Sequence, residues 1–242
     1  MAKEVEVILN LNEGVTEIIK SGLLKSCIEY LLYQRQQLPI PYHEVTRMVE
    51  QQESQDINAH VMERPGLRRS LNTEYKKAKK VYEDVECLFD NVNKLFMSTV
   101  VKSALVLLGS TPVSPKERYL LDFQNPEESN SLDISPRICN SSRRKLVRSL
   151  ISNPDLGTFK DISPTSMFVF IQASRSSDLQ WFRPKSTFKP PSRGQSCKIS
   201  VRTAHSEQLS PTDFNKDEWM WFQAPVIVRA QFTCALIHND SE

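Results

Sequence analysis

The segment 103–123, SALVLLGSTPVSPKERYLLDF, predicts two strands and the turn that joins them. Residues 103–109 are almost entirely apolar, which is typical of a strand buried on both faces. Residues 111–115 supply the prolines and the serine that favour a turn, and apolar side chains return over 117–123. The segment therefore indicates a β-hairpin or a β-arch, around which the other elements can be placed.

Long amphipathic helices are predicted before and after this pair of strands. Apolar residues recur at helical spacing over about 14–37, 72–98 and 134–152. In the middle helix, each apolar residue stands three or four positions after the previous one throughout. These residues are Tyr75, Ala78, Tyr82, Val85, Phe89, Val92 and Phe96. Because this stripe spans only about three heptads, burial against a sheet or another helix is favoured over a coiled coil. The apolar positions of the third helix are Ile138, Leu146, Leu150 and Ile151.

A polar connection separates the first two of these helices. Pro39 and Pro41 end the first helix, and a shorter helix is indicated over about 42–50. Residues 51–72 are polar and contain Pro65 and Gly66, a pattern that predicts a loop. The sequence thus predicts three long helices with an irregular connection between the first two.

Further strands are predicted near both ends of the chain. Residues 5–9 alternate apolar and polar side chains, and residues 167–171 are almost continuously apolar. The other strand candidates are Ile199–Val201, Trp219–Val228 and Gln231–Ile237. Helices gathered before a run of strands are typical of an α+β fold with an antiparallel sheet. We therefore expect one α+β domain over residues 1–242.

The composition argues against several classes of enzyme. The six glycines never lie closer than eight positions apart, so neither a dinucleotide fingerprint nor a Walker loop can be formed. The five cysteines contain no CxxC pair, and no two of the four histidines stand four residues apart. A Cys–His dyad assembled by the fold remains an alternative, but the sequence favours a protein that is not an enzyme and has no metal or cofactor.

The net charge of the chain indicates which partners it can bind, and its cysteines indicate its cellular compartment. The 31 Lys and Arg against 29 Asp and Glu give a net charge of +2, which predicts no strong polyanion partner. Residues 64–80 hold seven basic side chains against Glu74, yet Tyr75 and Tyr82 lie on the buried stripe, so a solvated or protein-contacting face is favoured over nucleic-acid binding. Spaced, unpaired cysteines and a charged N-terminus fit the cytosol or nucleus, and no apolar stretch reaches the length of a membrane span.

Four segments in this order and spacing resemble one known family. They are YQRQQLPIPY at 33–42, LVLLG at 105–109 with SPKE at 114–117, WFRPK at 181–185 with PSRG at 191–194, and WFQAPV at 221–226. The chain resembles the comet family of Mad-two-binding proteins over residues 5 to about 228. Residues 51–72 and 203–216 match it poorly.

The resemblance implies a HORMA-like fold, with three helices packed on an antiparallel sheet and a safety-belt-like strand region at the C-terminal end. The core would cover about 1–173 and the belt-like region about 174–242. It also implies a non-catalytic adaptor without a cofactor. Such an adaptor binds the closed conformer of the Mad-two HORMA protein and presents it to a hexameric AAA+ ATPase of the pachytene-checkpoint type, which promotes mitotic checkpoint complex disassembly and checkpoint silencing. We expect nuclear and cytoplasmic localisation, with the spindle or kinetochore in mitosis.

The alternative is a HORMA-like scaffold that closes its own belt around a partner peptide. Uptake of a peptide would need a belt that opens. The apolar tail 232–237 could instead fill that groove in cis.

The resemblance also assigns contact residues, which are carried over position by position. The residues expected to contact the closed partner are Gln34, Arg35, Arg144, Val147 and Arg148. The residues expected to contact the ATPase are Pro184 and Lys185. Val147 departs from the family, which has an aromatic residue there, so about 1–2 kcal/mol of interface burial would be lost. Without the resemblance, Gln34 would be a polar residue at a helix end and Pro184 part of a tight turn.

Overall fold

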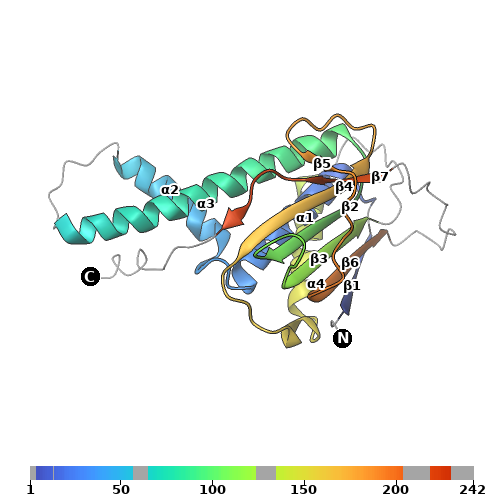
Figure 1. The fold of residues 1–242 in the computed structure, drawn as a ribbon, viewed down its shortest axis with the longest axis horizontal. Coiled ribbons are helices and arrows are strands. Elements are labelled where there is room, and N and C mark those ends of the chain that lie inside the picture. The colour runs from blue at the N-terminus through green and yellow to red at the C-terminus, as the bar shows by residue number, and fades with distance from the viewer. Residues whose placement is uncertain (1–3, 13, 57–64, 124–134, 204–218, 230–242) are drawn as a thin grey trace.

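The computed structural model describes residues 4–12, 14–56, 65–123, 135–203 and 219–229. Its elements, in chain order, are β1 (Glu4–Leu11), α1 (Glu17–Gln34), α2 (Tyr42–Asp56), α3 (Pro65–Ser98), β2 (Val101–Gly109), β3 (Glu117–Phe123), α4 (Pro136–Ile151), a short 3-10 helix (Leu156–Thr158), β4 (Ser166–Ser174), β5 (Arg183–Lys185), β6 (Gln195–Thr203), β7 (Trp219–Gln223) and β8 (Val228–Arg229). This is the α+β class that the pattern predicts, and Figure 1 shows one sheet with helices packed against it and with α2 and part of α3 extending beyond it.

The sheet is mixed, so the expectation of an antiparallel sheet is wrong in part. Its strand order is β1-β6-β3-β2-β4-β7-β5, with β8 also paired to β4. β2 runs antiparallel to β3, which makes the central pair a hairpin, and antiparallel to β4. β6 instead runs parallel to both β1 and β3. Parallel neighbours come from segments far apart in sequence, and no local periodicity reveals such a pairing.

Helix α1 is the central helix of the domain. Its residues Leu23, Leu24, Cys27 and Ile28 are essentially unexposed, because apolar side chains lie on more than one of its faces. It packs against α3 and against α4, and Figure 1 shows it lying against the sheet. α4 therefore forms an outer layer, with one face on α1 and β1 and the other toward solvent.

The short helix expected over about 42–50 is present as α2, so the described ranges contain four α-helices. The expectation of a loop over 51–72 is wrong in part, since α2 continues to Asp56 and α3 already begins at Pro65. Proline is favoured at the first position of a helix, where its missing N–H is not needed. The stripe of α3 is confirmed: Ala78, Val85 and Phe96 are buried. Figure 1 shows α2 beside the N-terminal part of α3, beyond the end of the sheet.

The C-terminal strands complete the far edge of the sheet. The expected strand Trp219–Val228 is divided into β7 and β8, and Gln231–Ile237 lies outside the described residues. β7 is hydrogen-bonded between β4 and β5. On the face of the sheet away from α1, a second apolar cluster forms, in which Phe188 stacks on Phe170 with ring centroids 4.2 Å apart. The division into a core and a safety-belt-like region stays a prediction.

Candidate functional site

Helix α4 has a buried face and an outward face, and its apolar and polar residues are arranged accordingly. Ser135 caps the helix by accepting a hydrogen bond from the Arg137 backbone N–H, and Pro136 occupies the first turn. Leu146 and Leu150 are buried, as their helical spacing predicts. Ile151 was expected in the same apolar set but is 66% exposed, because it lies one residue beyond that stripe at the end of the helix.

A hollow of about 620 Å³ lies where the outward face of α4 meets α1. We call it the α4 hollow, and its lining residues are Ser26, Asn140, Arg143, Arg144, Val147, Arg148 and Ile151. Val147 and Ile151 are one helical turn apart and provide its apolar surface. Three of the five expected contacts with a closed partner, Arg144, Val147 and Arg148, are thus brought together at one place.

The basic side chains of α4 are of two kinds: some interact with neighbouring groups of the protein, and others have no side-chain partner among the described residues. α4 contains five basic residues and no acidic one. Arg143 donates from Nε to Ser26 Oγ at 2.7 Å, and its Nη2 lies 3.6 Å from Glu29 Oε1. Lys145 donates to the backbone carbonyl of Asn10. Within the described part of the chain, neither Arg144 nor Arg148 has an ion pair or a side-chain hydrogen bond, and both are exposed.

A second, smaller hollow of about 230 Å³ adjoins the first. We call it the α1 hollow, because Gln34 and Arg35 at the C-terminal end of α1 line it together with Leu150, Ile151 and Phe159. Ile151 therefore lines both hollows. All five residues expected to contact a closed partner consequently lie in two adjoining depressions on one side of the molecule.

Arg35 has an internal partner that the sequence did not reveal. Its Nε lies 3.0 Å from Oε2 of Glu117, a carboxylate with no exposed surface. Tyr119 Oη also donates to Glu117 at 2.8 Å, and Gln195 Nε2 donates at 3.2 Å. We call these four side chains the Glu117 network. They connect α1, β3 and β6.

The electrostatics of the Glu117 network agree with a structural role. Burial raises the pKa of Tyr119, and the Glu117 carboxylate raises it further. Burial alone would lower the pKa of Arg35, but the hydrogen bonds with Glu117 outweigh it and the pKa is raised. The guanidinium is therefore charged and bound inside the protein, while its expected contact with a partner stays a prediction.

The two residues expected to contact an ATPase lie at the other edge of the sheet. Pro184 and Lys185 are exposed on β5, where they pair with Phe222 and Trp221 of β7. Trp181 and Phe182 precede them in edge-to-face contact at 4.8 Å, and Phe182 is buried. The aromatic residues thus anchor the segment, and β5 keeps Pro184 and Lys185 at the surface.

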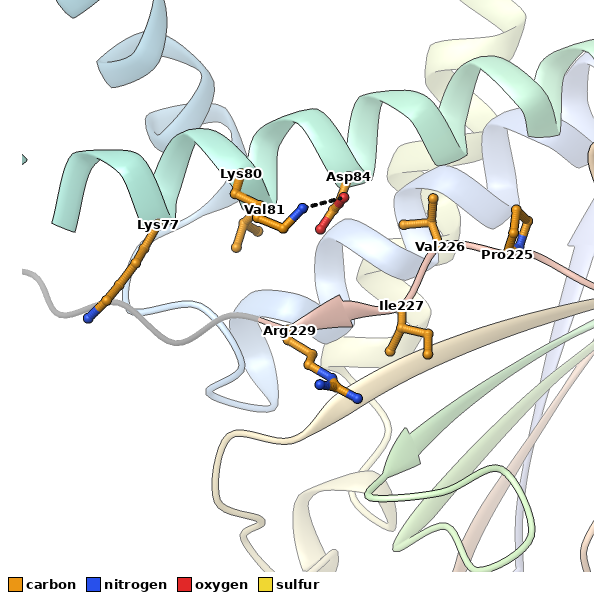
Figure 2. A pocket seen from close by; sticks show the side chains of 8 residues that line it. All are labelled: Lys77, Lys80, Val81, Asp84, Pro225, Val226, Ile227 and Arg229. Atoms are coloured by element: carbon orange, nitrogen blue, oxygen red, sulfur yellow. Dashed lines mark ion pairs between the residues drawn. The ribbon is translucent and has the colours of Figure 1, made fainter. Parts of the chain in front are cut away.

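A third hollow lies between α3 and the segment Pro225–Arg229, and we call it the α3 hollow. The basic side chains that line it interact with other side chains of this protein. Lys80 lies 3.5 Å from Asp84, as Figure 2 shows, and Lys77 lies 2.7 Å from Glu74. Arg229 donates to Ser166 Oγ at 3.0 Å. The α3 hollow therefore offers less unbound charge than the α4 hollow, and it contains none of the expected site residues.

The described ranges contain no group of three or more His, Cys, Asp or Glu side chains placed to hold a metal ion. Among the same residues, no helix has the length and apolar character needed to cross a bilayer. The thiols of Cys27 and Cys197 are buried in the core, and burial raises the pKa of Cys197 to about 12.

Comparison with known proteins points to a single family. Residues 20–233 match a family model described as "p31comet: Mad1 and Cdc20-bound-Mad2 binding". The chain is 27% identical over 200 residues to a human protein named MAD2L1-binding protein, covering 82% of this chain and 70% of the human one. It is 26% identical over 203 residues to the mouse protein of the same name, covering 84% and 70%. The matched range includes both hollows on the α4 side and strand β5.

Proposed function

This chain belongs to the p31comet family, and from that premise we propose that it is a non-catalytic adaptor for the closed conformer of Mad2. It binds Mad2 through the α4 hollow and the α1 hollow and presents it to a hexameric AAA+ ATPase. The result is disassembly of the mitotic checkpoint complex and checkpoint silencing. We further propose that it acts in the nucleus and cytoplasm. The names of the human and mouse relatives support Mad2 as the partner.

The observation that carries the proposal is the joined surface of the two α4-side hollows. Protein interfaces typically have an apolar centre, enrichment in arginine and a polar rim. Here Val147 and the exposed Ile151 supply the apolar centre, Arg144 and Arg148 are unbound cations, and Gln34 is an exposed polar residue nearby. The surface thus offers the composition that a protein partner needs.

The separation of two surfaces supports an adaptor. α4 packs beside β1 at one edge of the sheet, and β5 forms the opposite edge. Figure 1 shows both elements on the same domain with the sheet between them. Because Pro184 and Lys185 on β5 are exposed, the ATPase can contact them while Mad2 occupies the α4 side.

Conformer selection sets a further requirement on the Mad2 surface. A ligand favours one conformer only when its affinity for that conformer exceeds its affinity for the other. The adaptor must therefore read a feature of closed Mad2 that the open form lacks. Because this chain would contact Mad2 through one face of its own outer helix, the rest of Mad2 would stay accessible to the ATPase.

The scaffold alternative is less favoured by the strand arrangement. A peptide that pairs with β4 would need a free edge on that strand. In this chain β7 pairs with β4 over Phe170–Ser174, and β8 pairs with Ser166 and Met167. A peptide would have to displace these segments before it could bind. We therefore retain the adaptor as the proposed function.

The direct test is calorimetry of the chain with Mad2 locked in the closed form and, separately, in the open form. We expect binding to the closed form only, weakened by Gln34→Ala. In a coupled assay with the ATPase, Pro184→Ala with Lys185→Ala should slow disassembly while leaving Mad2 affinity unchanged. Equal affinity for the two Mad2 forms, or binding to neither, would contradict the proposal.

A further inference from the structure

The wall of the α4 hollow that α1 contributes is fixed before any partner arrives. Arg143 crosses from α4 to α1, where it donates to Ser26 Oγ at 2.7 Å and approaches Glu29 at 3.6 Å. Ser26 is buried, so this connection is held by the core. A preformed wall lowers the ordering cost of binding. The hollow is therefore present in the free protein.

Val147 and Ile151 form an apolar strip in the hollow, beside which there is space for another side chain. Val147 has a short side chain and is only half-buried, although it stands at the middle of the outward face. Ile151, one turn further along, is 66% exposed. Covering apolar area of this kind removes it from water, which favours association. A large apolar side chain fits such a place better than a polar one.

The rim next to this apolar strip is cationic. Arg144 and Arg148 stand one helical turn apart, adjacent to Val147. The described residues provide neither of them with an ion-pair partner. Arginine pairs most strongly with carboxylates, which it can hold through two parallel hydrogen bonds. Two unbound arginines beside an apolar strip thus define a specific combination of chemistry.

We propose that the α4 hollow is a socket that receives one large apolar side chain of the partner, with partner carboxylates facing Arg144 and Arg148. This inference rests on the proposed function, and it names the chemistry of the Mad2 surface that this chain recognises. The short side chain at position 147 is then a specificity determinant, because it makes room for a group that the partner supplies.

The sharpest test is to fill the socket from within. Val147→Phe places an aromatic ring in the space that the partner side chain would need. We expect the Kd for closed Mad2, measured by calorimetry, to rise about tenfold or more. Asn140→Trp, a substitution at an exposed position on the same rim, provides a second filling variant should the first disturb folding. Thermal unfolding of each variant reports on folding.

The cationic rim is tested by a matched pair of variants on the same helix. Arg148→Gln removes a rim charge, and Arg137→Gln removes an exposed charge in the first turn of α4, outside the hollow. We expect Arg148→Gln to raise the Kd about tenfold at low ionic strength and less at high salt, with Arg137→Gln changing it less than about twofold.

The outcomes separate the socket from the proposed function. Wild-type protein that binds closed Mad2, together with a Val147→Phe variant that binds equally well or more tightly, would overturn the socket and leave the adaptor standing. Equal losses for Arg148→Gln and Arg137→Gln would overturn the carboxylate pairing. Self-association of the free chain that Val147→Phe abolishes would show that a second copy fills the hollow, which also overturns the proposal. Wild-type protein that does not bind closed Mad2 would overturn both.

Discussion

Arginine has different surroundings in the Glu117 network and on the rim of the α4 hollow, where Arg144 and Arg148 lie. Arg35 is held by a fully buried carboxylate, so its charge stabilises the junction of α1, β3 and β6. Arg144 and Arg148 are exposed and have no such partner among the described residues. All three were expected at the same interface from the sequence. The location of the opposite charge, and not the residue type, distinguishes a structural arginine from one available for binding.

The largest effect is expected from breaking the Glu117 network. Arg35→Ala leaves the buried Glu117 carboxylate with only Tyr119 and Gln195, and removal of one partner of a buried ion pair costs about 3–5 kcal/mol. Denaturant unfolding should show a loss of about 3 kcal/mol. The matched control Arg144→Ala should change stability by less than about 0.5 kcal/mol. Similar losses in the two variants would show that the contrast between these arginines is wrong.

The next largest effect is expected at the centre of the α4 hollow. Val147→Glu removes apolar contact at the centre of the strip and introduces a carboxylate that competes with partner carboxylates for Arg144. Calorimetry should show binding to closed Mad2 weakened by about 2–3 kcal/mol or more. Thermal unfolding should be nearly unchanged, because Val147 is only half-buried. Unaltered affinity would exclude α4 as the interface.

A smaller effect is expected at the end of α1, where two glutamines provide a matched pair. Gln34 is exposed, so Gln34→Ala should weaken Mad2 binding by about 1 kcal/mol without changing stability. Gln37 is buried, donates to the Arg35 carbonyl at 2.6 Å and accepts from the Thr165 N–H at 2.7 Å. Gln37→Ala should therefore lower stability, as measured by denaturant unfolding. A Gln34→Ala variant that loses stability but keeps its Mad2 affinity, with Gln37→Ala showing the opposite, would place the interface elsewhere.

The smallest effect concerns pH and the acid that faces Arg143. Burial raises the pKa of Glu29, although Arg143 and Lys25 act in the opposite direction. A raised pKa means that the folded state binds this proton more tightly than the unfolded state, so Glu29 lowers stability as pH rises through and above the ordinary range of a glutamate. Glu29→Gln should remove that dependence. Over these pH values, the free energy of unfolding of Glu29→Gln should rise relative to that of wild type by less than about 1 kcal/mol, since solvent screens the partly exposed side chain.

Unfolding of both proteins at several pH values measures this difference. A Glu29→Gln variant that becomes less stable relative to wild type as pH rises would show that the ion pair with Arg143 dominates over burial. Arg143 would then depend on Glu29 for its position in the wall of the α4 hollow.

The sequence predicts those elements whose cause is local. The stripe of α3 was predicted because each apolar side chain stands three or four residues from the next, and burial of Ala78, Val85 and Phe96 confirms it. The hairpin of β2 and β3 was indicated by two apolar runs around a proline-rich turn. In such segments the neighbours that determine the structure lie within a few residues.

The remaining features depend on contacts between distant segments. The parallel pairing of β6 with β1 joins segments that lie far apart in the sequence, and no pattern within either strand specifies it. The ion pair between Arg35 and Glu117 spans 82 positions, so Arg35 could not be distinguished from Arg144 by sequence reasoning. Ile151 was counted among the apolar positions of its helix, and only the packed structure shows it exposed, one residue beyond the buried stripe.

In the proposed complex, closed Mad2 covers the face formed by α4 and the end of α1. Hydrogen–deuterium exchange of this chain, with and without closed Mad2, locates the covered face. We expect slower exchange in peptides covering 136–151 and 30–36, with unchanged rates over 77–84 and 225–229 at the α3 hollow. Protection of the α3 hollow with unchanged exchange in α4 would contradict the proposed complex.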